Sequence, residues 1–191
     1  MPLQVRAYQP TTPPEAVGLV TDQHRGQRLD RARLDRVVAS SRTVRDVIAT
    51  LTGNDRLTVR LQKLYPVAHV RHPGLPRLDT AGPVLGRHLE LAESTPPYRV
   101  LALCTELIVP ARLPHALAAA AATSVESLDR LLDAAGVEWH TELVTGPEQP
   151  AGTGTACPPA TALAVRRVWI GTPSPAPCAL VSEELHLAPL I

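Results

Sequence analysis

The sequence lacks the features that mark secreted and membrane-bound proteins. It has three cysteines, Cys104, Cys157 and Cys178, with no close CxxC spacing, so we expect reduced thiols rather than a disulfide framework. No apolar run is long enough to span a bilayer or to act as a signal peptide. These absences predict a cytoplasmic protein with no membrane partner.

The charge pattern does not suggest a nucleic-acid-binding surface. Lys and Arg together number 19, Asp and Glu number 18, and the formal net charge is +1. No cluster of basic residues is interleaved with aromatic ones, which make up 3% of the chain and include no Phe. The composition therefore predicts no nucleic-acid partner, whereas a small anionic ligand would require only local positive charge.

The common cofactor and catalytic motifs are also missing. No Gly-rich phosphate loop follows a predicted strand, and neither GxSxG nor HExxH occurs. His69 and His72 form an HxxH pair beside Pro73, but no strong ligand set accompanies them, which favours solvated loop histidines over a metal site. The sequence thus predicts neither a nucleotide cofactor nor a metal centre.

A chain of 191 residues is long enough for one well-buried core, and no change in composition suggests two. Residues 1–26 contain four prolines and no regular apolar repeat, so we expect a loosely ordered N-terminal arm. Residues 27–191 are then predicted to form a single domain.

The apolar periodicity of residues 27–191 changes between helical and strand-like patterns. Helical spacing predicts helices at 27–40, 43–51, 115–122 and 124–135, the last two forming a helix-loop-helix. Capping boxes are predicted at Thr43 with Asp46 and at Thr123 with Glu126. Strands are predicted as consecutive hairpins at 57–65, 84–91, 98–109, 137–144, 162–170 and 179–187. The expected fold class is α+β, with an antiparallel sheet of about six strands and with helices and helix-loop-helix lids over one face.

Two predicted strands each carry one charge on an otherwise apolar face. Alternation along 84–91 places Arg87 in a row of leucines, and alternation along 179–187 places Glu183 in a similar apolar row. An inward charge costs several kcal/mol of desolvation unless it is paired or meets a charged ligand. Two interpretations stay open, a ligand site and a structural ion pair. A slip of one residue in the face assignment would turn both charges to solvent.

Two predicted helix starts offer further contacts for an anion. Val44 lies in the first turn after Ser41 or Thr43, and Leu128 lies near the start of the fourth helix. Unpaired backbone N–H groups and the helix dipole favour anions at such positions. If both helices cover the face of Arg87, a ligand carboxylate would meet a guanidinium and two amides. Otherwise Val44 and Leu128 are ordinary core contacts.

Five segments between residues 29 and 187 carry a resemblance to a known family. They are SRTVRDVIATL, VLGRHLEL, LCTELIVPARLP, SVESLDRLL and CALVSEELHL. Their order and spacing resemble the chorismate pyruvate-lyase family, especially the branch that makes 4-hydroxybenzoate for phenolic lipids. The resemblance implies a chorismate lyase-like fold.

The resemblance also implies a reaction and a set of site residues. In that family an arginine and two backbone amides hold the ring carboxylate, and a glutamate reaches the hydroxyl at the other end of the ring. Matched by position, these are Arg87, the amides of Val44 and Leu128, and Glu183. The implied activity is a cytoplasmic lyase that converts chorismate to 4-hydroxybenzoate and pyruvate in aromatic acid biosynthesis or secondary metabolism. Arg87 would anchor the substrate, Glu183 would act as acid or base, and no metal or organic cofactor is required.

The expected partner is a small anionic aromatic or pre-aromatic substrate, and two other functions stay open. One is a divergent enzyme of this fold acting on another aromatic or polyketide acid, because Ser127-Leu128-Asp129 stands where the family commonly has Pro-Leu-Gly. The other is a ligand-sensing module, because effector domains of some bacterial regulators resemble this fold. The sequence allows a monomer or a small homo-oligomer, and it leaves open the roles of Trp139, His140, Arg166, Arg167 and Trp169.

Overall fold

The computed structural model describes residues 31–67, 78, 80, 82–148, 161–171 and 176–186. The predicted arm at 1–26, the pair of His69 and His72, and Cys157 lie outside these residues. None of the helices in the described ranges has the length and apolar character that a membrane crossing requires.

Six strands form one antiparallel sheet in the order β1-β2-β3-β6-β5-β4. The strands are β1 (Leu57–Pro66), β2 (Leu85–Glu93), β3 (Val100–Ile108), β4 (Trp139–Glu148), β5 (Thr161–Ile170) and β6 (Ala179–His186). With helices on one face, this architecture confirms the predicted α+β class. Each predicted strand is present, and β4 extends beyond the predicted end at residue 144.

The prediction of consecutive hairpins is wrong at the centre of the sheet. β1, β2 and β3 form one meander, β4, β5 and β6 form another, and β3 pairs with β6 rather than with β4. The near-continuous apolar sequence of β3 suits a strand that is covered by neighbours on both edges. Because β6 occupies the second edge of β3, the chain passes from β3 to the opposite edge of the sheet, where β4 lies.

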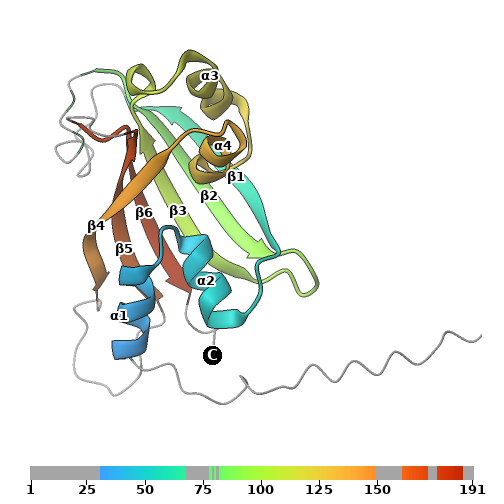
Figure 1. Cartoon of the computed structure of the whole chain (residues 1–191). Helices are drawn as coiled ribbons and strands as arrows, with labels where there is room; N and C mark the ends of the chain where they lie inside the picture. The colour runs from blue at the N-terminus through green and yellow to red at the C-terminus, as the bar shows by residue number, and fades with distance from the viewer. Residues whose placement is uncertain are drawn as a thin grey trace, which may run out of the picture.

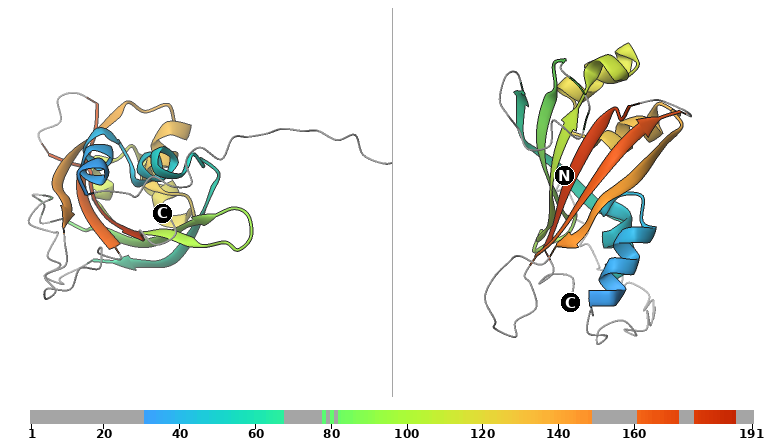
Figure 2. Two further views of the ribbon diagram at one scale, coloured as in Figure 1. Left: turned by 90° about the horizontal axis from the view of Figure 1, so that it is seen from below. Right: turned by 90° about the vertical axis from the view of Figure 1, so that its left-hand side faces the viewer.

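Four helices among the described residues lie in two pairs over one face of the sheet. The pairs are α1 (Arg31–Ser40) with α2 (Val44–Thr52), and α3 (His115–Thr123) with α4 (Leu128–Ala134); a short 3-10 turn, η2 (Pro110–Arg112), precedes α3. Figure 1 shows α1 and α2 near one end of the sheet and α3 and α4 near the other. The sheet curls around the helices (Figure 2), so both pairs lie on its concave side.

The start of α2 is fixed by the capping box that the sequence predicts. The Thr43 hydroxyl accepts a hydrogen bond from the Asp46 amide at 3.2 Å, and the Asp46 carboxylate accepts one from the Thr43 amide at 2.9 Å. At the other end, Gly53 caps the helix in the left-handed conformation, with φ of 69°. The position of the Val44 amide is therefore set by local sequence.

The capping box predicted for the last helix is wrong. Thr123 ends α3, where its hydroxyl donates to the carbonyl of Ala119. The Glu126 amide donates to the Ser124 hydroxyl within the connection, and α4 begins at Leu128. The alanine-rich segment has high helix propensity and continues through Thr123, so this residue is not free to cap a second helix.

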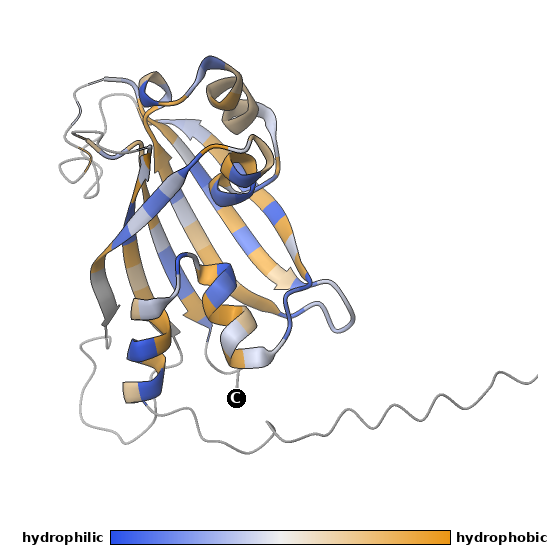
Figure 3. Ribbon diagram, in the orientation of Figure 1, coloured by the Kyte–Doolittle hydropathy of each residue, from blue (hydrophilic) through white to orange (hydrophobic). Residues whose placement is uncertain are grey.

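Apolar side chains pack on both faces of the sheet. On the concave side, one cluster beneath α1 and α2 includes Val38 and Leu89, and another beneath α3 and α4 includes Leu132 and Val168. A third cluster, which includes Leu107, lies on the opposite face. Figure 3 shows hydrophilic bands among the hydrophobic ones along the strands of the sheet.

Candidate functional site

Arg87 and Glu183 are both buried on the helix side of the sheet, as the alternation predicts. Arg87 is 0% exposed and Glu183 is 2% exposed. They do not pair with each other. Each belongs to a separate cluster with a charged partner on the neighbouring strand, Glu106 for the first and Arg166 for the second.

The first cluster, formed by Arg87 and Glu106, holds the start of α4 against β2 and β3. Arg87 Nη1 donates to Glu106 Oε2 at 3.0 Å, and Nη2 donates to the carbonyl oxygen of Ser124 at 3.1 Å and to that of Glu126. The second carboxylate oxygen, Glu106 Oε1, accepts a hydrogen bond from the Leu128 amide at 2.9 Å. The first N–H group of α4 is therefore satisfied by a glutamate of the sheet.

The second cluster, formed by Arg166 and Glu183, holds the start of α2 against β5 and β6. Arg166 Nε donates to Glu183 Oε2 at 2.9 Å, while its Nη1 and Nη2 donate to the carbonyls of Ser41 and Val38 at 2.8 and 2.9 Å. Glu183 Oε1 accepts from the Val44 amide at 3.0 Å. The first N–H group of α2 is thus satisfied by Glu183, as that of α4 is by Glu106.

The two clusters have the same parts. In each, an arginine pairs with a glutamate of the adjacent strand, the glutamate accepts the first amide of a helix, and the arginine donates to carbonyls ahead of that helix. The two helix pairs are therefore tied to the four central strands through charged side chains. Removing one partner of either buried ion pair would leave the other charge unpaired, at a cost of about 3–5 kcal/mol.

Burial is the largest influence on the pKa values of Glu106 and Glu183. It raises the pKa of Glu106 from 4.5 to about 7, although Arg87 and the Leu128 amide lower it. It raises the pKa of Glu183 from 4.5 to about 7 in the same way, although Arg166 lowers it. Near neutral pH both carboxyl groups are therefore close to their titration midpoints, and loss of an arginine would raise either pKa further.

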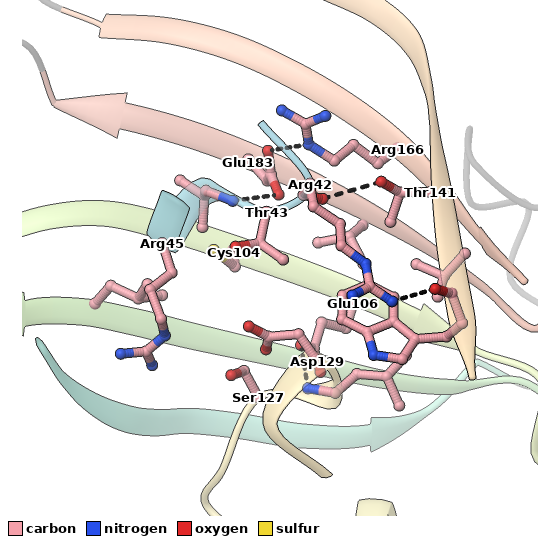
Figure 4. Close-up of a pocket in the computed structure, with 16 residues that line it drawn as sticks. Arg42, Thr43, Arg45, Cys104, Glu106, Ser127, Asp129, Thr141, Arg166 and Glu183 are labelled. Carbon is pink, nitrogen blue, oxygen red and sulfur yellow. Dashed lines mark hydrogen bonds and ion pairs between the residues drawn. The ribbon is translucent and has the colours of Figure 1, made fainter. Parts of the chain in front are cut away.

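A pocket lies between the two clusters. Its volume is about 480 Å³, counting the part that is open to solvent. Glu106 and Glu183 reach it from the sheet, and the starts of α2 and α4 form two of its sides (Figure 4). Apolar side chains supply much of the remaining wall, including Leu91, Val168 and Val181. The pocket therefore touches both helix pairs and the sheet at once.

The four predicted site residues lie around this pocket in a different arrangement from the predicted one. Val44, Leu128 and Glu183 line it, whereas Arg87 lies behind Glu106 and is not among its lining residues in the described part of the chain. The Arg87 guanidinium and the Leu128 amide were expected to hold a ligand carboxylate. In the structure they hold the carboxylate of Glu106.

Glu106 was not predicted as a site residue, although it shows the same inward placement on an apolar strand that identified Glu183. Glu106 alternates with Cys104 and Ala102 on β3, so the same face rule would have marked it as an inward charge. The face rule was applied to 84–91 and 179–187 but not to this strand, whose sequence is nearly continuously apolar. Of the two arginines whose roles were open, Arg166 is 2% exposed and lines the pocket, whereas Arg167 pairs with Glu142.

The aromatic residues whose roles were open fall on opposite faces of the sheet. Trp139 lines the pocket, donates its Nε1–H to Asp133 at 2.7 Å, and has the Arg42 guanidinium 3.5 Å from its ring centroid. His140 and Trp169 stack on each other with centroids 5.4 Å apart, on the face away from the helices. Trp139 is therefore available to a ligand and the stacked pair is not.

No protein-family model matches the chain, and no curated protein matches it. Several solved structures resemble this one at low sequence identity. The C-terminal domain of the histidine utilization repressor from Pseudomonas syringae is 14% identical with a TM-score of 0.44, covering 70% of this chain and 93% of that one. The effector domain of PhnF from Mycobacterium smegmatis is 13% identical with a TM-score of 0.45, covering 75% and 88%. A GntR-family transcriptional regulator from Enterococcus faecalis is 11% identical with a TM-score of 0.41, covering 69% and 94%.

The prediction of a carbon–oxygen lyase acting in chorismate and 4-hydroxybenzoate metabolism is wrong. The solved structures similar to this chain are described as a repressor domain, an effector domain and a transcriptional regulator, and no comparison names the chorismate lyase family. The geometry also argues against the implied carboxylate site, because the Arg87 guanidinium and the Leu128 amide both donate to Glu106. The α+β class with its six-stranded antiparallel sheet is the part of the prediction that the structure confirms.

Proposed function

We propose that this chain is a ligand-binding module of the effector type, which holds a small molecule between its two helix pairs and catalyses no reaction. The observation that carries the proposal is the pocket whose sides are the starts of α2 and α4 and whose floor is the sheet. Its wall combines apolar side chains with a few polar groups, which is the composition typical of small-molecule sites. A molecule bound there would contact both helix pairs.

The charged groups at the floor of the pocket favour binding over catalysis. Glu106 and Glu183 each accept hydrogen bonds from an arginine and from a helix amide, so both are engaged in holding the fold. Burial raises the pKa of the Cys104 thiol, which also lines the pocket, so this group is not a ready nucleophile. In the described part of the chain, these groups serve structure rather than proton transfer.

The position of the pocket explains how binding could be sensed. A ligand that contacts α2 and α4 together stabilises whichever arrangement of the helix pairs lets both contacts form. The helix pairs are tied to the sheet by the two clusters, so a shift at the pocket would be transmitted along β3 and β6. Val44, Leu128 and Glu183 are assigned to the pocket wall under this proposal, and Arg87 acts indirectly by holding Glu106.

A thermal-unfolding screen with small apolar and acidic compounds tests the proposal. A ligand at about 100 times its Kd stabilises the folded state by roughly 2.7 kcal/mol, which for a chain of this size raises Tm by about 5–10 °C. Val181→Phe fills the pocket and should abolish the shift. Val125→Phe, the same change at a side chain that is 55% exposed, is the matched control and should retain it.

Two results would contradict the proposal. A screen in which no compound raises the Tm of the unmodified protein would leave the pocket without a function. A shift that is equally large in Val181→Phe would place binding elsewhere. Incubation with chorismate should release no pyruvate above the rate measured for Val181→Phe.

A further inference from the structure

Two polar side chains at the pocket wall have hydrogen-bonding atoms with no partner among the described residues. Ser127 is 6% exposed, and its hydroxyl has no hydrogen bond. Arg45 Nε and Nη1 are shielded from solvent and are likewise unpaired. Both residues line the pocket (Figure 4), Arg45 from the first turn of α2 and Ser127 from the start of α4. Because buried donors are almost always satisfied in folded proteins, these atoms indicate a missing partner.

The Ser127 hydroxyl has no partner in the described part of the chain because Ser127 does not cap α4 with its side chain. The residue occupies the N-cap position of α4, yet its hydroxyl makes no capping hydrogen bond. The Leu128 amide behind it donates to Glu106 instead. The Ser127 hydroxyl can therefore donate and accept hydrogen bonds with a molecule in the pocket.

The charges around the pocket favour an anion at this wall. Once the two buried ion pairs are set aside, the charged lining residues are Arg42, Arg45 and Asp129. Arg42 donates to the carbonyl of Trp139 and lies over its ring. Asp129 lies in the first turn of α4, where a negative charge is favourable. Two cations thus face one carboxylate, and Arg45 is the cation whose donors are unused.

The floor of the pocket has no comparable place for an acidic ligand. Arg87 and Arg166 are both paired with glutamates of the sheet, and the amides of Val44 and Leu128 donate to the same two carboxylates. A ligand anion placed there would compete with two buried carboxylates of like charge. Near the wall formed by Arg45 and Ser127, the pocket is lined by one further carboxylate, that of Asp129, and the unpaired donors of Arg45 offset its charge.

We propose that Arg45 and Ser127 form an oxyanion subsite, and that the ligand is a small molecule with one acidic group and an apolar body. The inference rests on the proposed ligand-binding function and names its ligand class. The guanidinium would donate two hydrogen bonds to the acidic group, the Ser127 hydroxyl would donate a third, and the apolar body would pack on Val168 and Val181. The carboxylate of Asp129 lines the same pocket, which favours a monoanionic carboxylate over a phosphate dianion.

Titration calorimetry with benzoate, benzamide, benzylamine and phenyl phosphate tests the subsite on the full chain. Benzoate should bind at least about tenfold more tightly than neutral benzamide or cationic benzylamine, since charge-assisted hydrogen bonds account for such differences. Phenyl phosphate should bind more weakly than benzoate. Arg45→Gln should weaken benzoate about 10- to 100-fold and change benzamide by less than about twofold. Ser127→Ala should weaken benzoate by a smaller factor, about 3- to 10-fold.

A matched control and a conservative variant separate binding from folding. Arg60→Gln makes the same substitution at an exposed position of β1 and should leave benzoate affinity unchanged. Arg45→Lys keeps the charge without the planar fork and should recover part of the affinity. Circular dichroism of each variant confirms that the fold is intact.

The outcomes distinguish the subsite from the function on which it rests. Equal affinity for benzoate and benzamide, preference for benzylamine, or an Arg45→Gln variant that binds benzoate normally would overturn the subsite. If benzoate does not bind while neutral compounds bind in a manner that Val181→Phe abolishes, the subsite is wrong and the binding function stands. If none of these four compounds binds, the subsite is wrong, and the thermal-unfolding screen decides whether the binding function stands.

Discussion

Replacing Arg87 with Met tests how strongly the buried clusters hold the fold. Met is similar in length and apolar, so the change removes the charge with little change in packing. Arg87 is 0% exposed and donates to the Glu106 carboxylate and to the carbonyls of Ser124 and Glu126. The variant leaves all three acceptors without this donor. Breaking a buried ion pair in this way costs about 3–5 kcal/mol, a large share of a typical stability of roughly 5–15 kcal/mol.

The loss in Arg87→Met should depend on pH. Burial already raises the pKa of Glu106 to about 7, and removing the guanidinium removes an influence that lowers it. At pH 8 the variant must either bury an unpaired carboxylate or take up a proton, so the full cost applies. At pH 5.5 the carboxyl is protonated in the folded variant, and the remaining cost is that of the unsatisfied carbonyls, about 1–3 kcal/mol.

Urea unfolding followed by circular dichroism at pH 8 and pH 5.5 measures both quantities. Arg99→Met is the matched control, because Arg99 pairs with Glu93 at the surface and its side chain is 49% exposed. It should change the free energy of unfolding far less than Arg87→Met. Arg87→Lys, which keeps the charge, should fall between them. Equal losses in Arg87→Met and Arg99→Met, or a loss in Arg87→Met that is the same at both pH values, would refute the reasoning.

Two further predictions concern the glutamates and the second cluster. Because folding raises the pKa of Glu106 and of Glu183 from 4.5 to about 7, the folded state holds more protons between these values, and the free energy of unfolding should fall as pH rises through that window. Urea titrations should show this fall, with a shallower slope in Glu183→Gln; an equal or steeper slope in the variant would contradict the prediction. Arg166→Met removes the donors to the Ser41 and Val38 carbonyls, so amide hydrogen exchange should accelerate in α1 and α2 more than in α4. Uniform acceleration would count against a local tie.

Most of the fold could be predicted from the sequence because its signals are local. Apolar patterning predicted each of the six strands, by alternation in β1, β2 and β6 and by a near-continuous apolar run in β3, and the Thr43 capping box correctly placed the start of α2. The pairing of β3 with β6 joins segments distant in the chain, and no local pattern specifies it. The start of α4 was misplaced because Thr123 fits a cap equally well as a helix end, and the outcome depends on how far the alanine segment stays helical.

The site could be predicted in part, and its errors have one physical origin. Arg87 and Glu183 were correctly identified as buried charges, but each was assigned to a ligand because its partner was not identified. Glu106 satisfies Arg87, and Arg166 satisfies Glu183, through pairings between adjacent strands that require the register of the sheet. Arg45 could not be found from the sequence, since an arginine in the first turn of a helix is most often solvated.

Amide hydrogen exchange with a stabilising compound tests the central claim most directly. The claim is that one bound molecule touches the starts of both α2 and α4. Saturation with a compound that raises Tm should slow exchange at residues 41–48 and at residues 124–132 together, and Val181→Phe should show neither effect. Slowing at one helix start alone, or slowing that persists in Val181→Phe, would contradict the account.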